Sequence, residues 1–340
     1  ESIYIRIDCY HNMIINILTY TLINFLFFIV VTKISYFYNL LDNPIERSVH
    51  TKPTAYTGGI SLSLAFILSV YLFDFTYKLN LILSLSFLIA LVGFIDDKFH
   101  LNVGGKLSLQ IFPIMYLIIS GNLGLNYIGD YNFFKLQLGT FSIPFTLLSI
   151  LFLVNSFNYF DGIDGTLATS TISVISILFF LIPEQNMRLF LIVIFIPLLI
   201  FLLFNFSVFN LPKLFLGDSG SLLLGFVISF TLIFVAKEKL VHPILLAFSI
   251  SIFVYEFISI NIIRLKNKRN LFLGNKDHLH HKLFEYNQSI FQTNLSIFIL
   301  NIFLFIIGYI GYLLIGPLAS IIIFIILFYI YFILRNKYLI

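Results

Sequence analysis

Residues Ile143–Gly165 read IPFTLLSILFLVNSFNYFDGIDG, an apolar segment that ends in two carboxylates set between glycines. Residues 143–160 are long enough to cross a bilayer as an α-helix, which needs about 20 mostly apolar residues. Hydrocarbon cannot satisfy polar groups, so amides and acids in such a helix face other helices or a water-filled cavity. The segment therefore predicts a membrane helix whose last residues take part in ligand binding or catalysis.

The composition of the whole chain agrees with this interpretation. Hydrophobic residues make up 59% of the 340 residues and charged residues only 11%, whereas about 25% is usual in a soluble domain. We therefore predict an all-α polytopic membrane protein, without internal repeats. The lone Cys9 excludes an internal disulfide framework and a Cys-rich metal site. The net charge of +4 does not point to nucleic acid.

About eleven apolar segments have a length that suits membrane helices. The segment at 107–120 is short and contains Pro113, which predicts a kinked or tilted helix. Gly316-Pro317 predicts a tight turn between the last two helices. We expect residues 13–340 to form a single integral-membrane domain after a polar, irregular extension at 1–12. The predicted helices are residues 14–35, 58–75, 79–95, 107–120, 143–160, 166–183, 189–204, 219–236, 242–263, 291–315 and 317–334.

Alternate connections between these helices fall on opposite sides of the membrane. Most Lys and Arg residues lie on one side, which the positive-inside rule makes cytoplasmic. The N-terminus is then outside and the C-terminus is cytoplasmic. Outside, the connection 121–142 contains Gly129-Asp130 and alternating Phe134, Leu136 and Leu138, which predicts a small hairpin. The connections rich in acids, amides and histidines are all cytoplasmic: 44–59, 96–106, 161–165, 205–221 and 264–283.

Two adjacent acids, Asp96 and Asp97, end the third predicted helix. The two carboxylates repel each other unless a cation or a proton lies between them. The pair therefore favours a site for a magnesium-bound diphosphate or a general base. The alternative is an acidic cap on a helix end at the membrane interface.

In the opening segment, Asn155, Asn158 and Asp161 are spaced i, i+3, i+6 and share one side of a helix. Their side-chain oxygens are the donors that Mg²⁺ accepts. Gly162 and Gly165 allow the backbone to approach a ligand and to turn into the next helix. Hydrogen bonding between helices is the alternative for the amides, but it does not explain the acids and glycines.

The segment Phe215–Ser221 reads FLGDSGS and precedes the eighth predicted helix. Asp218 is a candidate metal ligand. Ser219 or Ser221 could cap the helix, and the free N–H groups of the first turn suit a phosphate. The alternative is an ordinary N-cap box with Asp218 and Ser219 as the capping residues.

Histidine is concentrated in the cytoplasmic segment Asp277-His278-Leu279-His280-His281. No second cluster of Cys, His or Glu with metal-ligand spacing completes a zinc site in the sequence. Histidine cations or donors that face a diphosphate are therefore favoured, and a solvated polar loop is the alternative. The basic residues of Arg47–Thr54, which precede Gly58-Gly59, and Lys106 could grip a lipid phosphate or simply anchor the chain at the cytoplasmic face.

Together these motifs resemble the polyprenyl-phosphate N-acetylhexosamine-1-phosphate transferases, of the glycosyltransferase family 4 type. The likeness covers residues 36–285. This family starts O-antigen, teichoic acid and enterobacterial common antigen synthesis and includes the peptidoglycan translocase. The resemblance implies transfer of an N-acetylhexosamine 1-phosphate from a UDP-sugar to undecaprenyl phosphate, at the cytoplasmic face of a bacterial inner membrane. His278-x-His280-His281 after Asp277 is similar to the group that uses UDP-N-acetylhexosamines, whereas Thr57-Gly58-Gly59 departs from the Arg or Met that many members have before the glycines.

The resemblance also implies roles for individual residues. Mg²⁺, or Mn²⁺ in its place, would be bound by Asn158 and Asp218. The catalytic acids would be Asp96, Asp97, Asp161 and Asp164. Asp96 and Asp97 would bind the metal ion of the diphosphate or take the proton from the lipid phosphate. Asp161 and Asp164 would bind the uridine. Phe215 would stack on uracil. The residues expected to bind substrate are His50, Lys52, Lys106, Asn155, Asn205, Phe215, His278, His280 and His281.

The expected partners are undecaprenyl phosphate, a UDP-N-acetylhexosamine and membrane lipids, with no nucleic acid and with a homodimer left open. Within the family, the alternative function is that of a phospho-MurNAc-pentapeptide transferase. An ion-coupled transporter is the alternative of another class, but its acids would lie near the membrane midplane and often in repeats. A catalytically inactive lipid-binding scaffold is a third alternative, although all the acids that the family uses are present.

Overall fold

The computed structural model describes residues 2–44, 52–269 and 277–338. These residues are largely α-helical and contain two small antiparallel sheets. The chain forms two compact units, residues 1–100 with 189–223 and residues 101–188 with 224–340. The boundaries between the units fall after His100, within α7 (Gln185–Asn205) and within α8 (Gly217–Lys237).

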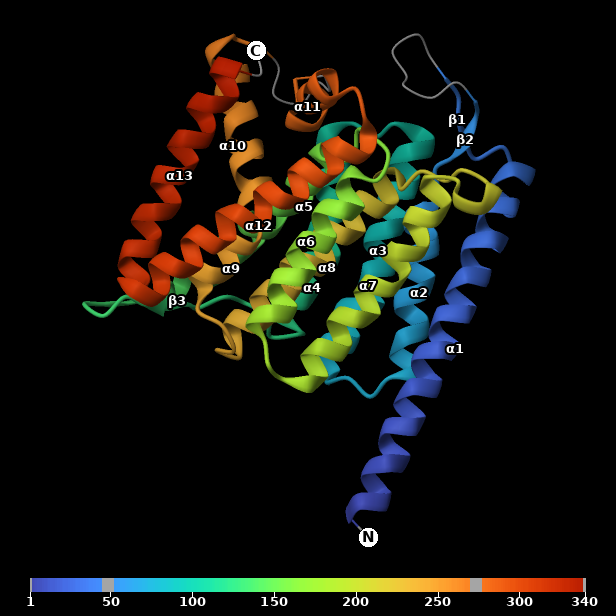
Figure 1. The fold of residues 1–340 in the computed structure, drawn as a ribbon, viewed down its shortest axis with the longest axis horizontal. Helices are drawn as coiled ribbons and strands as arrows, with labels where there is room; N and C mark the ends of the chain where they lie inside the picture. The colour runs from blue at the N-terminus through green and yellow to red at the C-terminus, as the bar shows by residue number, and fades with distance from the viewer. Residues whose placement is uncertain (1, 45–51, 270–276, 339–340) are drawn as a thin grey trace. The chain divides into compact units, whose positions relative to one another are not determined.

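In the first unit, α2 packs against both α1 and α3 (Figure 1). The Tyr20 hydroxyl of α1 donates a hydrogen bond of 2.9 Å to the Val193 carbonyl of α7, and both helices bury Phe side chains. The α1 helix begins at Ser2, so the residues expected to form an irregular extension belong to the same helix. The elements of this unit are α1 (Ser2–Phe37), β1 (Leu41–Asp42), β2 (Thr54–Ala55), α2 (Gly58–Leu72), α3 (Tyr77–Phe99), η2 (Val208–Asn210), most of α7 and the start of α8.

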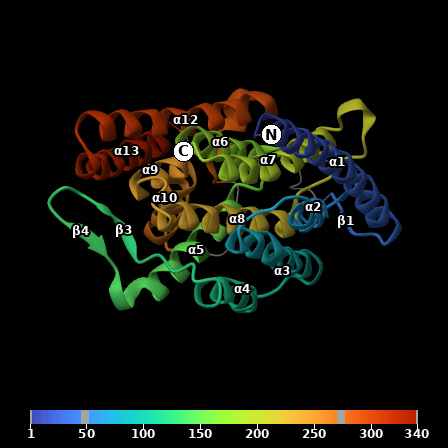
Figure 2. The same cartoon turned by 90° about the horizontal axis from the view of Figure 1, so that it is seen from below.

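In the second unit, α12 packs against α6, α9 and α13, and Figure 2 shows α12 and α13 next to each other. The expected hairpin is confirmed, because β3 and β4 pair antiparallel. The expected turn at Gly316 is also confirmed, with a φ of +111° between α12 and α13. The elements are the start of α7, the rest of α8, α4 (Val103–Ile119), β3 (Tyr127–Asp130), β4 (Lys135–Gln137), η1 (Gly139–Phe141), α5 (Ser142–Tyr159), α6 (Thr166–Leu181), α9 (Pro243–Ser249), α10 (Ser251–Lys266), α11 (Leu279–Asn287), α12 (Ile290–Leu314) and α13 (Pro317–Tyr338).

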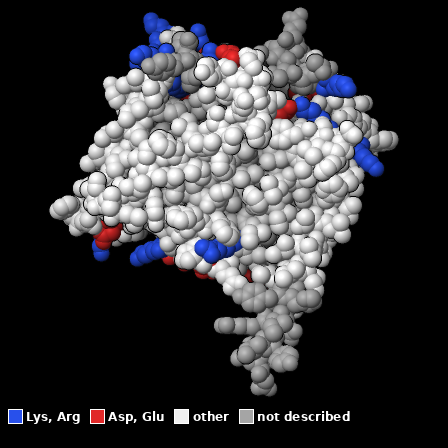
Figure 3. Space-filling model, viewed as in Figure 1, with Lys and Arg blue, Asp and Glu red and all other residues white. Residues whose placement is uncertain are grey.

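Every apolar segment predicted to cross the membrane coincides with a helix or a helix pair. In the part of the chain that the structure describes, seven helices are long and apolar enough to cross by themselves, and the α9–α10 pair passes the same test as one bent segment. Among the same residues α2, α4 and α6 are also apolar but shorter. In each unit, charged side chains gather near the helix ends on the face drawn in Figure 3. These features identify an all-α, multi-pass membrane protein.

The segment predicted as one helix at 242–263 is broken, and α9 and α10 meet at an angle of 70°. The break lies at Ile250, and the side chain of Asn301 from α12 supplies the missing hydrogen bonds. Its Oδ1 accepts from the Ile252 N–H at 3.3 Å, and its Nδ2 donates to the Ser249 carbonyl at 2.9 Å. A polar side chain on a neighbouring helix therefore makes the break tolerable in hydrocarbon.

Candidate functional site

In the first unit, Asp97 at the end of α3 caps the N-terminus of α8. Its Oδ1 accepts the Asp218 N–H at 3.0 Å and its Oδ2 accepts the Ser219 N–H at 3.3 Å. The N–H groups of a first helical turn have no partner within their own helix, and a carboxylate there is favoured by the helix dipole. The contact joins residues 121 positions apart, and it holds Asp218 in place.

This arrangement corrects the prediction that a serine caps α8 and leaves its N–H groups free for a phosphate. The Ser219 hydroxyl donates to the Leu216 carbonyl at 3.3 Å, and the Ser221 hydroxyl donates to the Asp218 carbonyl at 3.3 Å. Both hydroxyls donate to carbonyl oxygens, and the Asp97 carboxylate accepts the N–H groups of the first turn.

Close backbone contacts around Asp218 require glycine. A Cβ on Gly93 of α3 would lie 2.3 Å from the Asp218 carbonyl oxygen, and a Cβ on Gly59 of α2 would lie 2.0 Å from the Gly220 nitrogen. Gly217 has a φ of +71°, a conformation that glycine adopts readily. Three helices therefore meet at the start of α8 with almost no space between their backbones.

The strand that precedes α2 lies beside the segment that precedes α8. The Phe215 N–H donates to the Ala55 carbonyl at 2.7 Å, and the Gly58 N–H donates to the Phe215 carbonyl at 2.9 Å. The Asn205 Nδ2 donates to the Leu214 carbonyl at 2.9 Å, so this buried amide supports the same segment. These bonds fix the backbone on which the Phe215 ring is presented.

The remaining predicted residues of the first unit surround this segment. Asp96 is 9% exposed, and Lys52 is exposed. The Lys213 ammonium lies 5.3 Å from the centre of the half-buried Phe215 ring. The pKa of the Tyr56 hydroxyl is raised by burial and by the negative charge of Asp97. His50 lies outside the described residues.

In the second unit, α5 ends with Asn158 and Tyr159, and a tight turn leads into α6. The Asn294 Nδ2 of α12 donates to the Asp164 carbonyl at 2.9 Å, so α12 holds this turn in place. The Asn155 Nδ2 donates to the Leu151 carbonyl of its own helix at 2.7 Å. Asp161 lies in the turn, and Lys106 lies in the first turns of α4.

The turn after α5 lies directly against the histidine segment. A Cβ on Gly162 would lie 2.3 Å from the His280 Nε2 and 2.9 Å from the His281 Nε2. The His278 and His280 rings are nearly parallel at 5.6 Å, and the His280 and His281 centroids are 4.4 Å apart. Two motifs that are more than a hundred residues apart in the sequence therefore form one cluster.

The buried histidines of this cluster are neutral near pH 7. Burial lowers the pKa of His278 to about 4, against the opposing effect of Glu256, and burial lowers the pKa of His280 well below its usual range. Both ring nitrogens of His280 and the Nδ1 of His278 have no hydrogen-bond partner among the described residues. Of the two predicted forms, neutral donors are favoured over cations.

The structure also brings to this cluster two charged residues that sequence reasoning did not select, Glu256 of α10 and Arg335 of α13. They form a buried ion pair at 2.8 Å, and Glu256 accepts the Leu279 N–H at 2.7 Å. Glu256 could have been found from the sequence, because an acid inside an apolar segment usually marks a functional or paired group.

No group of three or more His, Cys, Asp and Glu side chains in the described part of the chain is arranged to hold a metal ion by itself. The predicted ligands belong to different units, Asp218 to the first and Asn158 to the second. The first unit contains Lys52, Asp96, Asp97, Asn205, Phe215 and Asp218, and the second contains Lys106, Asn155, Asn158, Asp161, Asp164, His278, His280 and His281.

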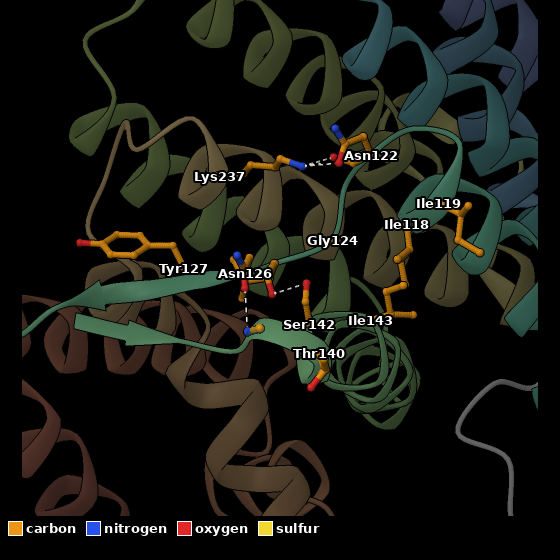
Figure 4. A pocket seen from close by; sticks show the side chains of 12 residues that line it. Ile118, Ile119, Asn122, Gly124, Asn126, Tyr127, Thr140, Ser142, Ile143 and Lys237 are labelled. Atoms are coloured by element: carbon orange, nitrogen blue, oxygen red, sulfur yellow. Dashed lines mark hydrogen bonds between the residues drawn. The ribbon is translucent and has the colours of Figure 1, made fainter. Parts of the chain in front are cut away.

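A separate cavity of about 670 Å³ lies in the second unit beside the hairpin, and its described lining contains none of the predicted site residues. It is lined by the end of α4, the start of α5 and the end of α8. Figure 4 shows Lys237 pointing to Asn122, whose Oδ1 accepts from the ammonium at 2.8 Å. We assign it no role in the site.

The family model of glycosyl transferase family 4 matches residues 79–236, which contain the Asp96-Asp97, Asn155–Gly165 and Asp218 motifs. Over these residues the chain is similar to this family. Relatives with curated names are similar to about three quarters of the chain. A probable undecaprenyl-phosphate N-acetylglucosaminyl 1-phosphate transferase of Bacillus subtilis (strain 168) is 26% identical over 269 residues, which are 76% of this chain and 74% of the relative.

Two enterobacterial relatives show the same kind of similarity. An undecaprenyl-phosphate alpha-N-acetylglucosaminyl 1-phosphate transferase of Escherichia coli (strain K12) is 23% identical over 265 residues, 76% of this chain and 72% of the relative. The protein of the same name from Yersinia pestis is 24% identical over 266 residues, 75% of this chain and 72% of the relative. All three names state one kind of reaction.

Proposed function

We propose that this protein transfers an N-acetylhexosamine 1-phosphate from a UDP-sugar to undecaprenyl phosphate and so starts the synthesis of a cell-envelope polysaccharide. It is a phospho-sugar transferase, as the family match and the names of its relatives indicate. The observation that carries the proposal is that the family match of residues 79–236 contains all three acidic motifs. The acceptor phosphate oxygen bonds to the sugar-linked phosphorus, and the bond from that phosphorus to UMP breaks. The products are polyprenyl-diphosphate-sugar and UMP.

In this proposal Asp96 and Asp97 of the first unit have different roles. Asp97 holds the start of α8, because its two oxygens accept the Asp218 and Ser219 N–H groups. Asp96 is then the acid that takes the proton of the lipid phosphate. Phe215, whose backbone is fixed on both sides by residues 55 and 58, stacks on the uracil ring.

The second unit holds the remaining residues that we propose to bind substrate. Asp161 and Asp164 bind the uridine, and α12 steadies their turn through Asn294. His278 and His280 donate from neutral rings to the diphosphate oxygens, which their low pKa favours at neutral pH. The protein then acts mainly by positioning the reacting groups and by offsetting their charge.

The donor set fits Mg²⁺, with Mn²⁺ as a substitute. Asp218 offers carboxylate oxygens at a helix start that Asp97 fixes, and Asn158 offers an amide oxygen. Mg²⁺ commonly uses one or two carboxylates together with substrate phosphates and water. When bound, it would offset the charge of the diphosphate and of the departing UMP. Asp218 and Asn158 are the proposed ligands.

The location of the site follows from the predicted topology. With the N-terminus outside and the C-terminus cytoplasmic, about eleven membrane helices put the acidic motifs and the histidine segment at the cytoplasmic face of the inner membrane. Undecaprenyl phosphate then reaches the site from the bilayer, and the nucleotide sugar reaches it from the cytoplasm.

The test is release of UMP by the purified full chain with undecaprenyl phosphate, Mg²⁺ and one of several UDP-sugars. We expect release with UDP-GlcNAc or another UDP-N-acetylhexosamine, and none without the lipid phosphate. Release only with UDP-MurNAc-pentapeptide would replace this proposal by the peptidoglycan alternative. No release with any of these donors would contradict the enzyme proposal.

A further inference from the structure

A carboxylate in the second unit is buried inside an apolar helix and has four hydrogen-bond donors. Glu256 of α10 is 1% exposed. Its oxygens accept from the Tyr331 hydroxyl at 2.6 Å, from Arg335 Nε at 2.8 Å and Nη2 at 3.2 Å, and from the Leu279 N–H at 2.7 Å. A charge in this setting is costly unless it is paired and fully hydrogen-bonded, and Glu256 is both.

The ion pair contacts the backbone on both sides of His278. Besides its two bonds to Glu256, Arg335 donates from Nη2 to the Asp277 carbonyl. Glu256 accepts the Leu279 N–H at the start of α11. The peptide units before and after His278 are therefore bound to two charges that come from α13 and α10.

A second buried cation, Arg264, supports the His278 ring through Tyr159. Arg264 of α10 donates from Nη1 to the Tyr159 hydroxyl at 3.2 Å and lies 5.3 Å from the centre of that ring. The Tyr159 ring meets the His278 ring edge to face at 5.0 Å. The ion pair thus holds the backbone on both sides of His278, and Tyr159, which Arg264 contacts, packs against its ring.

Stability alone is a weak explanation for this cluster. Replacing a buried ion pair by apolar residues of similar volume is often neutral or stabilising. Here Arg335 Nη2 and Glu256 Oε1, which bond to each other, also bond to the backbone on the two sides of His278, where an apolar pair could not bind. The arrangement selects one conformation of the segment.

We propose that Glu256 and Arg335 are positioning residues that set the histidine segment, residues 278–281, for substrate, so that the end of the last helix takes part in binding the nucleotide sugar. The inference rests on the proposed function in one respect, that these histidines bind the diphosphate. Arg335 and Tyr331 never touch substrate in this account, and they act through residues 277–279.

The kinetic test uses Glu256→Gln, Arg335→Gln and the milder Tyr331→Phe in the full-length protein. Loss of a hydrogen bond to a charged group should raise the KM for the UDP-sugar about tenfold or more in the first two variants. Tyr331→Phe, which removes one hydroxyl, should raise it less. A purely structural role would reduce the amount of active enzyme and leave the KM unchanged. The matched controls are Glu285→Gln and Tyr329→Phe, whose side chains are exposed on α11 and α13.

A second measurement does not depend on turnover. Diethyl pyrocarbonate modification, mapped by mass spectrometry, should spare His278 and His280 in the unaltered protein and modify the exposed His100 rapidly. In Glu256→Gln and Arg335→Gln, the two buried histidines should react several-fold faster while His100 is unchanged.

The two measurements separate the inference from the proposed function. If the unaltered protein releases no UMP but the histidines become reactive in the variants, the proposed function fails and the positioning role stands. Unchanged histidine reactivity in both variants, or an unchanged KM in folded Tyr331→Phe, Glu256→Gln and Arg335→Gln alike, would overturn the positioning role.

Discussion

Replacing Gly93 by alanine tests the contact between α3 and α8 on which the acidic site depends. The added Cβ would lie 2.3 Å from the Asp218 carbonyl oxygen and 2.4 Å from its carbonyl carbon and from the Ser219 nitrogen. All three are backbone atoms, so no side chain can rotate away. The helices must separate by about 1 Å to restore an ordinary contact of 3.4 Å.

That separation has a calculable effect on the Asp97 cap. The bonds to the Asp218 and Ser219 N–H groups are 3.0 and 3.3 Å, and about 1 Å more takes both beyond hydrogen-bonding distance. Overpacking of this kind costs about 1–3 kcal/mol in stability. A displacement of about 1 Å at a reacting group can lower the rate about 100-fold.

The assay compares UMP release and thermal unfolding in detergent for Gly93→Ala and for Gly104→Ala. Gly104 lies in a helix too, but its Cβ would meet only the Asn102 Oδ1 at 3.6 Å. We expect a large loss of turnover and a lower unfolding temperature in Gly93→Ala, and neither in Gly104→Ala. Near-normal turnover in a folded Gly93→Ala protein would refute the proposed role of this close contact.

Three further predictions concern the second unit. Asn301→Leu should lower the free energy of unfolding by about 2–4 kcal/mol, measured by denaturation in mixed micelles, because it leaves buried backbone groups at the α9–α10 break unsatisfied; unchanged stability would contradict the role given to Asn301. The pKa of His278 falls from 6.5 to about 4 on folding, so the free energy of unfolding should be constant above pH 6.5 and decrease by up to about 3 kcal/mol as the pH falls to 4. The decrease should be smaller in His278→Gln. A pH-independent unfolding temperature would argue against burial of a neutral ring. Gly162→Ala should lower kcat/KM by displacing the His280 ring, whose Nε2 would lie 2.3 Å from the new Cβ, whereas equal kinetics would show that the ring moves freely.

The helices could be predicted from the sequence because hydrocarbon demands long apolar segments with internal hydrogen bonds. The hairpin at 127–137 and the turn at Gly316 were also readable from local residue types. The break at Ile250 could not be predicted, because the flanking residues contain no glycine or proline. Its cause is the side chain of Asn301, which lies 49 residues after its partner Ile252. Long-range polar contacts decide such features, and apolar periodicity does not report them.

The candidate site shows the same limit. The motif residues were identified from their types and spacing, and the closeness of Gly162 to His280 confirms that two of the motifs meet. The capping role of Asp97 depends on a partner 121 residues later, so local sequence suggested a serine cap instead. Glu256 was visible as an acid in an apolar segment, but its partner Arg335 is 79 residues away and could equally have been a cytoplasmic anchor.

The central claim is that the acids of this chain catalyse phospho-sugar transfer to a lipid phosphate. Its most direct test is UMP release from UDP-N-acetylhexosamine and undecaprenyl phosphate by the unaltered protein, by Asp218→Asn and by a control, Asp130→Asn, whose carboxylate pairs with Lys135 in the hairpin outside the predicted site. We expect release by the unaltered protein and by Asp130→Asn, and loss of release in an Asp218→Asn protein that still folds. Release at the normal rate by Asp218→Asn, or none by the unaltered protein, would contradict the claim.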